Sequence, residues 1–170
     1  TLRVDDNTWH HAVMTRVKSS GAIKTYINGS VYDVTSSGTG NISLGNITLG
    51  VREADNQRWY GGSLDELAVW SDDLSTDEII ALYNSGVGLN AGSNSGNYTS
   101  SGDLVGYWKM NEGSGNTIAD ASSNSNNATI SGASWASGNA LRDNAAPTVT
   151  SVSSTTNNGS YKADDVIAIT

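Results

Sequence analysis

The chain has 170 residues and a net charge of −8, with 9 Lys and Arg against 17 Asp and Glu. An acidic surface repels a phosphate backbone, which argues against a nucleic-acid partner. The absence of Cys excludes disulfides, thiolate metal sites and Cys nucleophiles. No stretch approaches the roughly 18 apolar residues of a membrane span, so membrane insertion is not expected.

The first half of the chain is predicted to be antiparallel β-sheet. Residues 8–17 alternate in a period of two, which is typical of a strand. In residues 22–34, Asn28-Gly29 stands between two β-rich runs, and this dipeptide tolerates the positive φ of a tight hairpin turn. Residues 46–53 and 62–70 predict two further strands.

A short helix is predicted in "LSTDEIIALYNSG". Ser75 and Glu78 have the spacing of a capping box, and Leu74 can pack on Ile79 as a hydrophobic staple. Gly86 is expected to end the helix.

The second half returns to β-structure after residues 87–102, whose Gly, Ser and Asn content predicts a linker or long loop. Residues 103–110 and 127–135 predict strands on either side of a polar loop. Two β-like runs follow Pro147 without closing any structure. The chain therefore reads as one domain and the start of another.

The segments "TWHHAVMT", "IKTYINGSVYD" and "GGSLDELAVWSDDLSTDEIIALYNSG" occur in this order within residues 9–86. Together they resemble the C-terminal half of laminin-G-like, concanavalin A-like jelly rolls, especially the pentraxin-related group. The resemblance implies an all-β fold, an antiparallel jelly-roll β-sandwich with one short helix.

The same resemblance suggests a domain organisation. Residues 1–142 are interpreted as a partial laminin-G-like sandwich, to which residues 103–135 supply closing strands. The alternative is that 103–135 open a second such domain, but too few residues remain to build one. Residues 146–170 resemble the start of an immunoglobulin-like or cadherin-like repeat.

Catalytic patterns are missing from this sequence. Concanavalin A-like glycosidases of the laminarinase type need two carboxylates about 5 Å apart on one strand face, which an E-x-D spacing provides. Asp65 and Glu66 are adjacent, so on a strand they would point to opposite faces. His10 and His11 are adjacent too, which argues against a zinc site or a Ser-His-Asp triad. We therefore expect no enzyme activity from this segment.

An aromatic pair offers a candidate sugar site. Trp59 and Tyr60 lie in a predicted loop, where an exposed ring could stack on a pyranose, with Arg58 and Gln57 as polar partners. The alternative is that these rings are buried. The other large aromatics are expected to lie in the core: Trp9, Trp70, Tyr107 and Trp108.

The polar loop offers a candidate calcium site. From Asp120 onward, "DASSNSN" places side-chain oxygens at alternate positions, as a hard cation prefers. It is no EF-hand, because Ser125 and Ser131 stand where Gly and Glu are required. The family's calcium positions, where that site is present, carry over onto Glu112, Asp120 and Asn124. One loop carboxylate supplies little charge, so Glu112 or a distant acid has to join it. The full set of candidate metal ligands is Asp120, Asn124, Glu112, Asp65 and Glu66. For the last two, the alternative is that one carboxylate binds backbone groups and the other faces water.

The resemblance implies a non-catalytic carbohydrate-binding or adhesion module of a larger surface or virion protein. Calcium is its candidate cofactor, a glycan or cell-surface protein its partner, and the extracellular space or cell surface its location. Two alternatives remain open: a structural spacer without a ligand, and an accessory domain of a glycoside hydrolase whose active site lies elsewhere.

Overall fold

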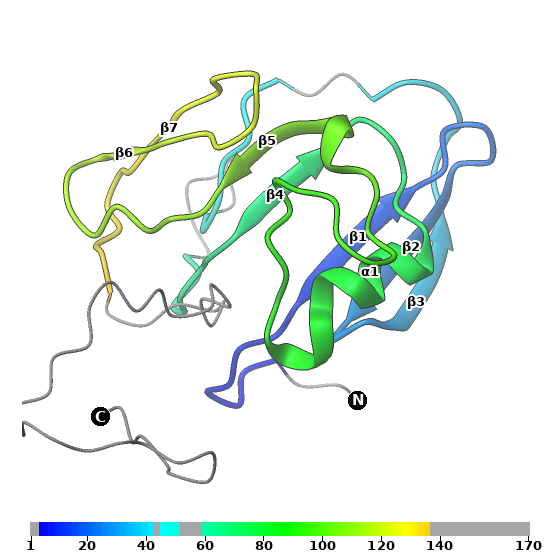
Figure 1. Ribbon diagram of the computed structural model, residues 1–170, viewed down its shortest axis with the longest axis horizontal. Coiled ribbons are helices and arrows are strands. Elements are labelled where there is room, and N and C mark those ends of the chain that lie inside the picture. The colour runs from blue at the N-terminus through cyan, green and yellow to red at the C-terminus, as the bar shows by residue number, and fades with distance from the viewer. Residues whose placement is uncertain (1–3, 43–44, 52–58, 137–170) are drawn as a thin grey trace, which may run out of the picture.

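The computed structural model describes residues 4–42, 45–51 and 59–136 (Figure 1). Gln57, Arg58 and the predicted repeat at 146–170 lie outside these residues. The strands are β1 (Ala12–Arg16), β2 (Ala22–Ile27), β3 (Ser30–Ser36), β4 (Leu67–Trp70), β5 (Leu104–Trp108), β6 (Thr117–Ile118) and β7 (Ala128–Thr129). The helices are α1 (Thr76–Tyr83) and two 3-10 turns, η1 (Asn84–Gly86) and η2 (Ser101–Asp103).

Strands β1, β2 and β3 form an antiparallel sheet in that order. The predicted hairpin is confirmed, because Asn28 and Gly29 have φ values of 52° and 76° between β2 and β3. Residues with a side chain rarely adopt this left-handed backbone region. Asparagine tolerates it, and glycine adopts it freely.

The second half pairs β4 with β5 and β6 with β7, both antiparallel. Of the strand predicted over 62–70, only the last four residues form a strand, β4. Glu66, directly before it, has a left-handed φ of 55°, which interrupts the extended backbone. The strand predicted over 46–53 is wrong for residues 46–51, which form no strand. The strand predicted over 127–135 is confined to β7.

Helix α1 begins with the predicted capping box. The Ser75 side chain accepts the backbone N–H of Glu78 at 3.2 Å, and the Glu78 carboxylate accepts the backbone N–H of Ser75 at 3.0 Å. Asn84 ends the helix in a left-handed conformation, two residues before the predicted Gly86. Asparagine fits this position because its short polar side chain tolerates left-handed backbone.

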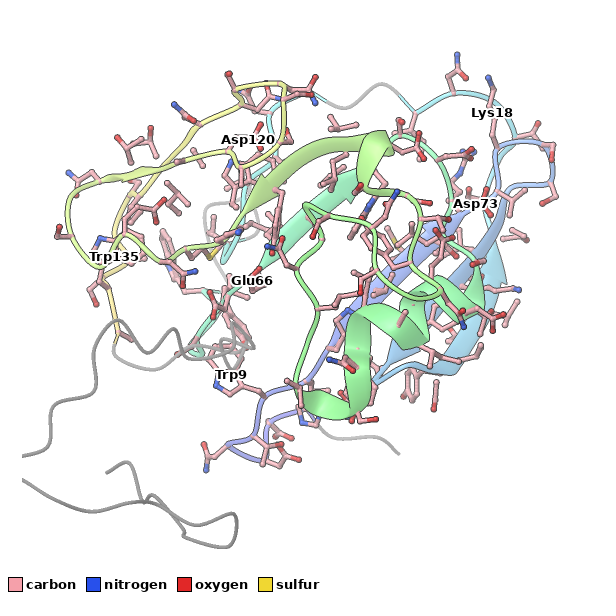
Figure 2. All side chains as sticks on the ribbon, viewed as in Figure 1. Trp9, Lys18, Glu66, Asp73, Asp120 and Trp135 are labelled. Carbon is pink, nitrogen blue, oxygen red and sulfur yellow. The ribbon has the colours of Figure 1, made fainter. Side chains whose placement is uncertain are left out.

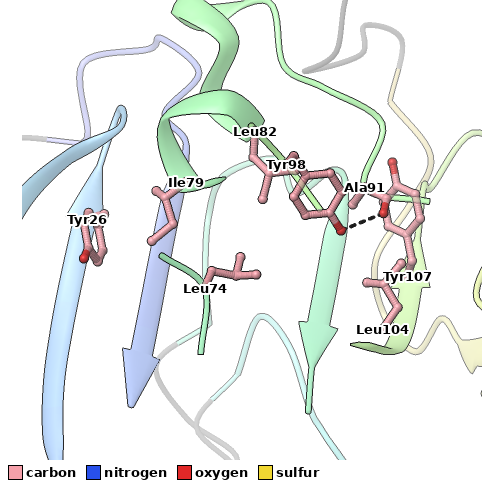
Figure 3. Close-up of a cluster of buried hydrophobic side chains, with 8 residues drawn as sticks. All are labelled: Tyr26, Leu74, Ile79, Leu82, Ala91, Tyr98, Leu104 and Tyr107. Atoms are coloured by element: carbon pink, nitrogen blue, oxygen red, sulfur yellow. Dashed lines mark hydrogen bonds between the residues drawn. The ribbon is translucent and has the colours of Figure 1, made fainter. Parts of the chain in front are cut away.

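The core joins α1, the two larger sheets and the loop 87–100 (Figure 3). Tyr98 is fully buried, and its hydroxyl donates to the carbonyl of Ala91 at 2.8 Å and accepts the indole N–H of Trp70 at 3.0 Å. The segment predicted as a linker or long loop is therefore a loop that packs into the core. The buried apolar cluster is Tyr26, Leu74, Ile79, Leu82, Ala91, Tyr98, Leu104 and Tyr107.

The other face of the sheet β1–β3 carries exposed apolar side chains. Met14 is 72% exposed there, whereas Val13 and Thr15 point toward the core face. The whole of β3 is exposed. The predicted fold class is confirmed: the structure is mostly antiparallel strand with one short helix, and the sandwich is only partly formed.

Candidate functional site

A groove runs between β1 and β4. Its apolar lining includes Leu74, Leu82 and Leu89, which belong to the core or pack against it. Trp9 and Tyr60 also line the groove. The lining of the groove therefore combines exposed aromatic residues with side chains that belong to the protein core or pack against it.

The exposed aromatics near the groove are the candidate sugar-stacking rings. Trp59 is 65% exposed and Tyr60 is 56% exposed, and the backbone N–H of Tyr60 donates to the carbonyl of Gly50 at 2.8 Å. Trp9 is 47% exposed, so its predicted place in the core is wrong. It precedes β1 rather than lying within it, and the alternation that would turn it inward does not apply.

The remaining predicted core aromatics are buried or partly buried. Tyr107 and Trp108 are 1% and 8% exposed, and Trp70 packs against the core cluster. The Trp108 indole N–H donates to the carbonyl of Asn126 at 2.7 Å. This bond leaves no polar atom of the Trp108 ring unpaired in its buried position.

Glu66 is a half-buried carboxylate of the groove lining (Figure 2). The Tyr107 hydroxyl donates to its Oε2. Burial raises the pKa of Glu66, although the hydrogen bond from Tyr107 opposes this rise. The pKa of Tyr107 is raised as well, by burial and by the Glu66 carboxylate. Asp65 also lines the groove and raises the pKa of Glu66 by its charge. Because Glu66 precedes β4 in a left-handed conformation, strand alternation does not set the directions of these two side chains.

Asp120 organises the polar loop of residues 111–130. Its Oδ1 accepts the backbone N–H groups of Tyr107 and Ser122, each at 2.8 Å. Its Oδ2 accepts the Ser122 hydroxyl and the Asn126 backbone N–H, again at 2.8 Å. Burial alone would raise the pKa of Asp120, but these bonds outweigh it and lower the pKa. All four hydrogen bonds to the Asp120 carboxylate therefore come from groups of the protein itself.

The loop asparagines pair with the outer edge of β5. Asn124 Nδ2 donates to the carbonyl of Leu104 at 2.8 Å, and Asn126 Nδ2 donates to the carbonyl of Val105 at 2.9 Å. The backbone N–H of Ala121 donates to the carbonyl of Tyr107 at 2.7 Å. Side-chain amides thus satisfy backbone groups that a neighbouring strand would otherwise pair.

The predicted metal ligands are distributed over separate places. Tyr107 binds Asp120 through its backbone N–H and Glu66 through its hydroxyl, so the two carboxylates lie at opposite ends of one tyrosine. Glu112 accepts the backbone N–H of Ala119 at 2.9 Å. Within residues 4–42, 45–51 and 59–136, no group of three or more His, Asp or Glu side chains is placed to hold a metal. These residues do not form a ready-made calcium cage, and calcium stays a prediction.

The two histidines support the hairpin β2–β3. Both precede β1, so their predicted strand positions are wrong. His10 lies 2.9 Å from Asp6 through Nε2 and 3.2 Å from the Asn28 amide through Nδ1. His11 stacks on Tyr83 with ring centroids 6.1 Å apart, and burial lowers its pKa. The backbone of His11 exchanges bonds with Asn28 at 3.0 and 2.8 Å.

The groove and Trp9 were not identified from the sequence. One available signal was the polar run Asp5-Asp6-Asn7 before Trp9, which marks a turn rather than a strand. No sequence signal reveals the groove, because it depends on the separation of two strands that are far apart in the chain.

Comparison with protein families gives one match. Residues 1–80 match the family model described as the concanavalin A-like lectin/glucanases superfamily. The match confirms the superfamily resemblance over these residues, which are just under half of the chain. Comparison with curated proteins and with solved structures gives no match. Among the described residues, no helix is long and apolar enough to cross a membrane.

Proposed function

We propose, from the concanavalin A-like lectin/glucanase match of residues 1–80, that this chain is a non-catalytic carbohydrate-binding or adhesion module. In this proposal it acts at the cell surface or outside the cell as part of a larger surface or virion protein. The observation that supports glycan binding most directly is the exposure of Trp59 and Tyr60, at 65% and 56%.

The aromatic pair suits a sugar ring. A pyranose presents apolar C–H groups on one face, and an exposed indole or phenol offers a flat apolar surface to stack on it. Tyr60 lines the groove together with Asp65 and Glu66. Carboxylates accept hydrogen bonds from sugar hydroxyls, so this end of the groove combines stacking with polar recognition.

A glycan array with the whole chain tests this function. We expect binding by the native chain and a loss of about tenfold in affinity for Trp59→Ala, since one stacking contact is worth about 1 kcal/mol or more. Tyr32→Ala is the matched control, because Tyr32 is 54% exposed on β3 and does not line the groove. Absence of binding with and without calcium would refute glycan recognition and favour the spacer.

Calcium is proposed as a cofactor of the loop that contains Glu112, Asp120 and Asn124. A cation there must compete with the four protein donors that already bind the Asp120 carboxylate. Thermal melts in calcium and in EDTA measure this directly. An unchanged melting temperature would remove calcium from the proposal and leave the loop with a structural role.

A further inference from the structure

We propose that His10 is a pH-sensitive latch. In its neutral form it joins the tip of the hairpin β2–β3 to the segment before β1 that carries Trp9, and a proton on the ring releases the hairpin tip. The latch is built from Asp6, His10 and Asn28. It goes beyond the proposed glycan function and does not depend on it.

The Asn28 amide has one favoured orientation, because the backbone of His11 fixes it. The His11 N–H donates to Asn28 Oδ1 at 3.0 Å, so this end of the side chain is an acceptor. The Asn28 N–H donates in return to the carbonyl of His11 at 2.8 Å. The NH₂ group of Asn28 lies 3.2 Å from His10 Nδ1. Because an NH₂ group only donates, Nδ1 of His10 is the acceptor of this bond.

The other ring nitrogen of His10 faces acceptors. Its Nε2 lies 2.9 Å from Asp6 Oδ1 and 3.1 Å from Thr8 Oγ1. The Thr8 hydroxyl already donates to Asp6 at 2.7 Å, so it offers its lone pairs to the ring. Hydrogen bonds from Thr8 and His10 lower the pKa of Asp6 to about 2, so this carboxylate is charged at neutral pH and only accepts. Nε2 therefore carries the hydrogen, and His10 is the neutral Nε2–H tautomer.

A further proton on His10 adds at Nδ1, where it meets the NH₂ group of Asn28. Two donors then face each other, and the hydrogen bond between Nδ1 and Asn28 is lost. A flip of the Asn28 amide moves this conflict without removing it, since the NH₂ group then faces the His11 N–H. The bond to Asp6 remains and becomes charge-assisted on both sides. Protonation therefore keeps His10 on its own segment and releases the hairpin tip.

The latch joins a strained turn to a residue of the groove. Asn28 has a left-handed φ of 52°, a backbone region that is costly for a residue with a side chain and persists only where its surroundings hold it. The bonds of its amide to His10 and His11 supply this support. Trp9 directly precedes His10, is 47% exposed and lines the groove (Figure 2). Release of Asn28 therefore loosens the contact between the hairpin tip and the segment that carries Trp9.

The titratable groups around the latch set the direction of its response. Asp6 is the carboxylate that contacts the ring, Asp5 precedes it in the same segment, and the hairpin contributes a neutral amide. The neighbouring His11 stacks on helix α1, and burial lowers its pKa. The side chain of His10 is 14% exposed, so protons reach it from solvent. Histidine changes charge between about pH 8 and pH 5, so the latch is closed at the upper end of this range and open at the lower end.

Nitrogen NMR of the histidine rings in the whole 170-residue chain tests the tautomer directly. At pH 8 we expect His10 to show a protonated Nε2 and an unprotonated Nδ1, and at pH 5 both nitrogens protonated. The spectrum of His10→Gln identifies which signals belong to this ring. An Nδ1–H tautomer or a charged ring at pH 8, or a neutral ring at pH 5, would overturn the proposal.

Amide hydrogen exchange measures the release of the hairpin tip. The backbone amides of His11 and Asn28 each take part in the contact between the two segments. Between pH 8 and pH 5 we expect their protection factors, corrected for the intrinsic exchange rate, to fall about fivefold, because one neutral hydrogen bond is worth about that factor. Equal protection at the two pH values would contradict the release.

Three variants separate the latch from a general effect of acid. Asn28→Asp tolerates the left-handed turn and presents an acceptor to the charged ring, so the loss of protection is expected to disappear. It is expected to disappear in His10→Gln as well, since glutamine does not titrate. Asp33→Asn removes an exposed carboxylate from β3 of the same hairpin and is expected to keep the loss unchanged. A loss that persists in Asn28→Asp or His10→Gln, or that is absent from Asp33→Asn, would refute the latch.

Discussion

Glu78 holds the start of α1 against the loop that follows it. Its Oε2 accepts the backbone N–H and hydroxyl of Ser75 at 3.0 and 2.9 Å. Its Oε1 accepts the backbone N–H and hydroxyl of Thr99 at 3.3 and 3.2 Å and the hydroxyl of Ser100 at 2.5 Å. Burial would raise the pKa of Glu78, but these bonds outweigh it and lower the pKa to about 2. We predict that Glu78→Gln destabilises the chain mainly through this cluster.

The magnitude follows from the bonds. A glutamine keeps one acceptor oxygen but places an NH₂ group where the second oxygen stood. This NH₂ group is a donor, and it faces either the Ser75 N–H or the donors of Thr99 and Ser100. A lost bond to a charged group costs about 1.5–3 kcal/mol. The lowered pKa alone corresponds to about 3 kcal/mol, which screening by solvent reduces to about 2. We expect a loss of about 2–3 kcal/mol in the free energy of unfolding.

The pH dependence gives the sharper test. Because the folded-state pKa is lowered from 4.5 to about 2, the stabilisation is complete above about pH 4.5. It is lost as the pH falls toward 2. Glutamine does not titrate, so the stability difference between native and variant chains should shrink over this range. Urea denaturation at pH 7, 4.5 and 2.5, followed by tryptophan fluorescence, measures this difference.

Asp77→Asn is the matched control for Glu78→Gln. It removes a charge from the same first turn of α1, but Asp77 is exposed. The helix dipole makes this change worth only about 0.3–1 kcal/mol. A stability difference for Glu78→Gln that is constant from pH 7 to 2.5, or no larger than that for Asp77→Asn, would refute the proposed role of the carboxylate cluster.

Three further changes test other parts of the fold by urea denaturation. Asp120→Asn replaces one acceptor oxygen by a donor group, so we expect a loss of about 2 kcal/mol in the free energy of unfolding at pH 7. This loss should shrink in acid, because the pKa of Asp120 is lowered in the folded chain. An unchanged denaturation midpoint at pH 7 would contradict this. Gly106→Ala places a Cβ 2.4 Å from the ring of Trp108, which is expected to cost about 2 kcal/mol, whereas Gly102→Ala meets no atom within 4 Å and serves as control. Tyr98→Phe leaves the buried partners of its hydroxyl unpaired, at an expected cost of about 1–3 kcal/mol; equal stability of the variant would show that water replaces the hydroxyl.

The local elements of the first half could be predicted from the sequence because their signals are local. Asn28-Gly29 determines the backbone of a hairpin turn, and Ser75 with Glu78 determines the first turn of a helix. The predicted strand over 46–53 relied on composition alone, and residues 46–51 do not form it. Without a partner strand, β-propensity does not hold a segment extended.

The candidate site depended far more on the tertiary structure. Trp9 and Trp59 are exposed in the folded chain. The sequence alone does not decide this, because aromatic residues occur both in protein cores and on surfaces. The sequence placed oxygens at alternate positions around Asp120. Only the fold turned the backbone N–H groups of Tyr107 and Asn126 toward that carboxylate. The tertiary structure also separates Glu66 from Asp120, because Tyr107 of β5 lies between them. Its hydroxyl donates to Glu66 and its backbone N–H donates to Asp120. A short sequence pattern specifies the donors and acceptors that a segment carries, whereas the partner of each one is set by strands brought together from distant parts of the chain.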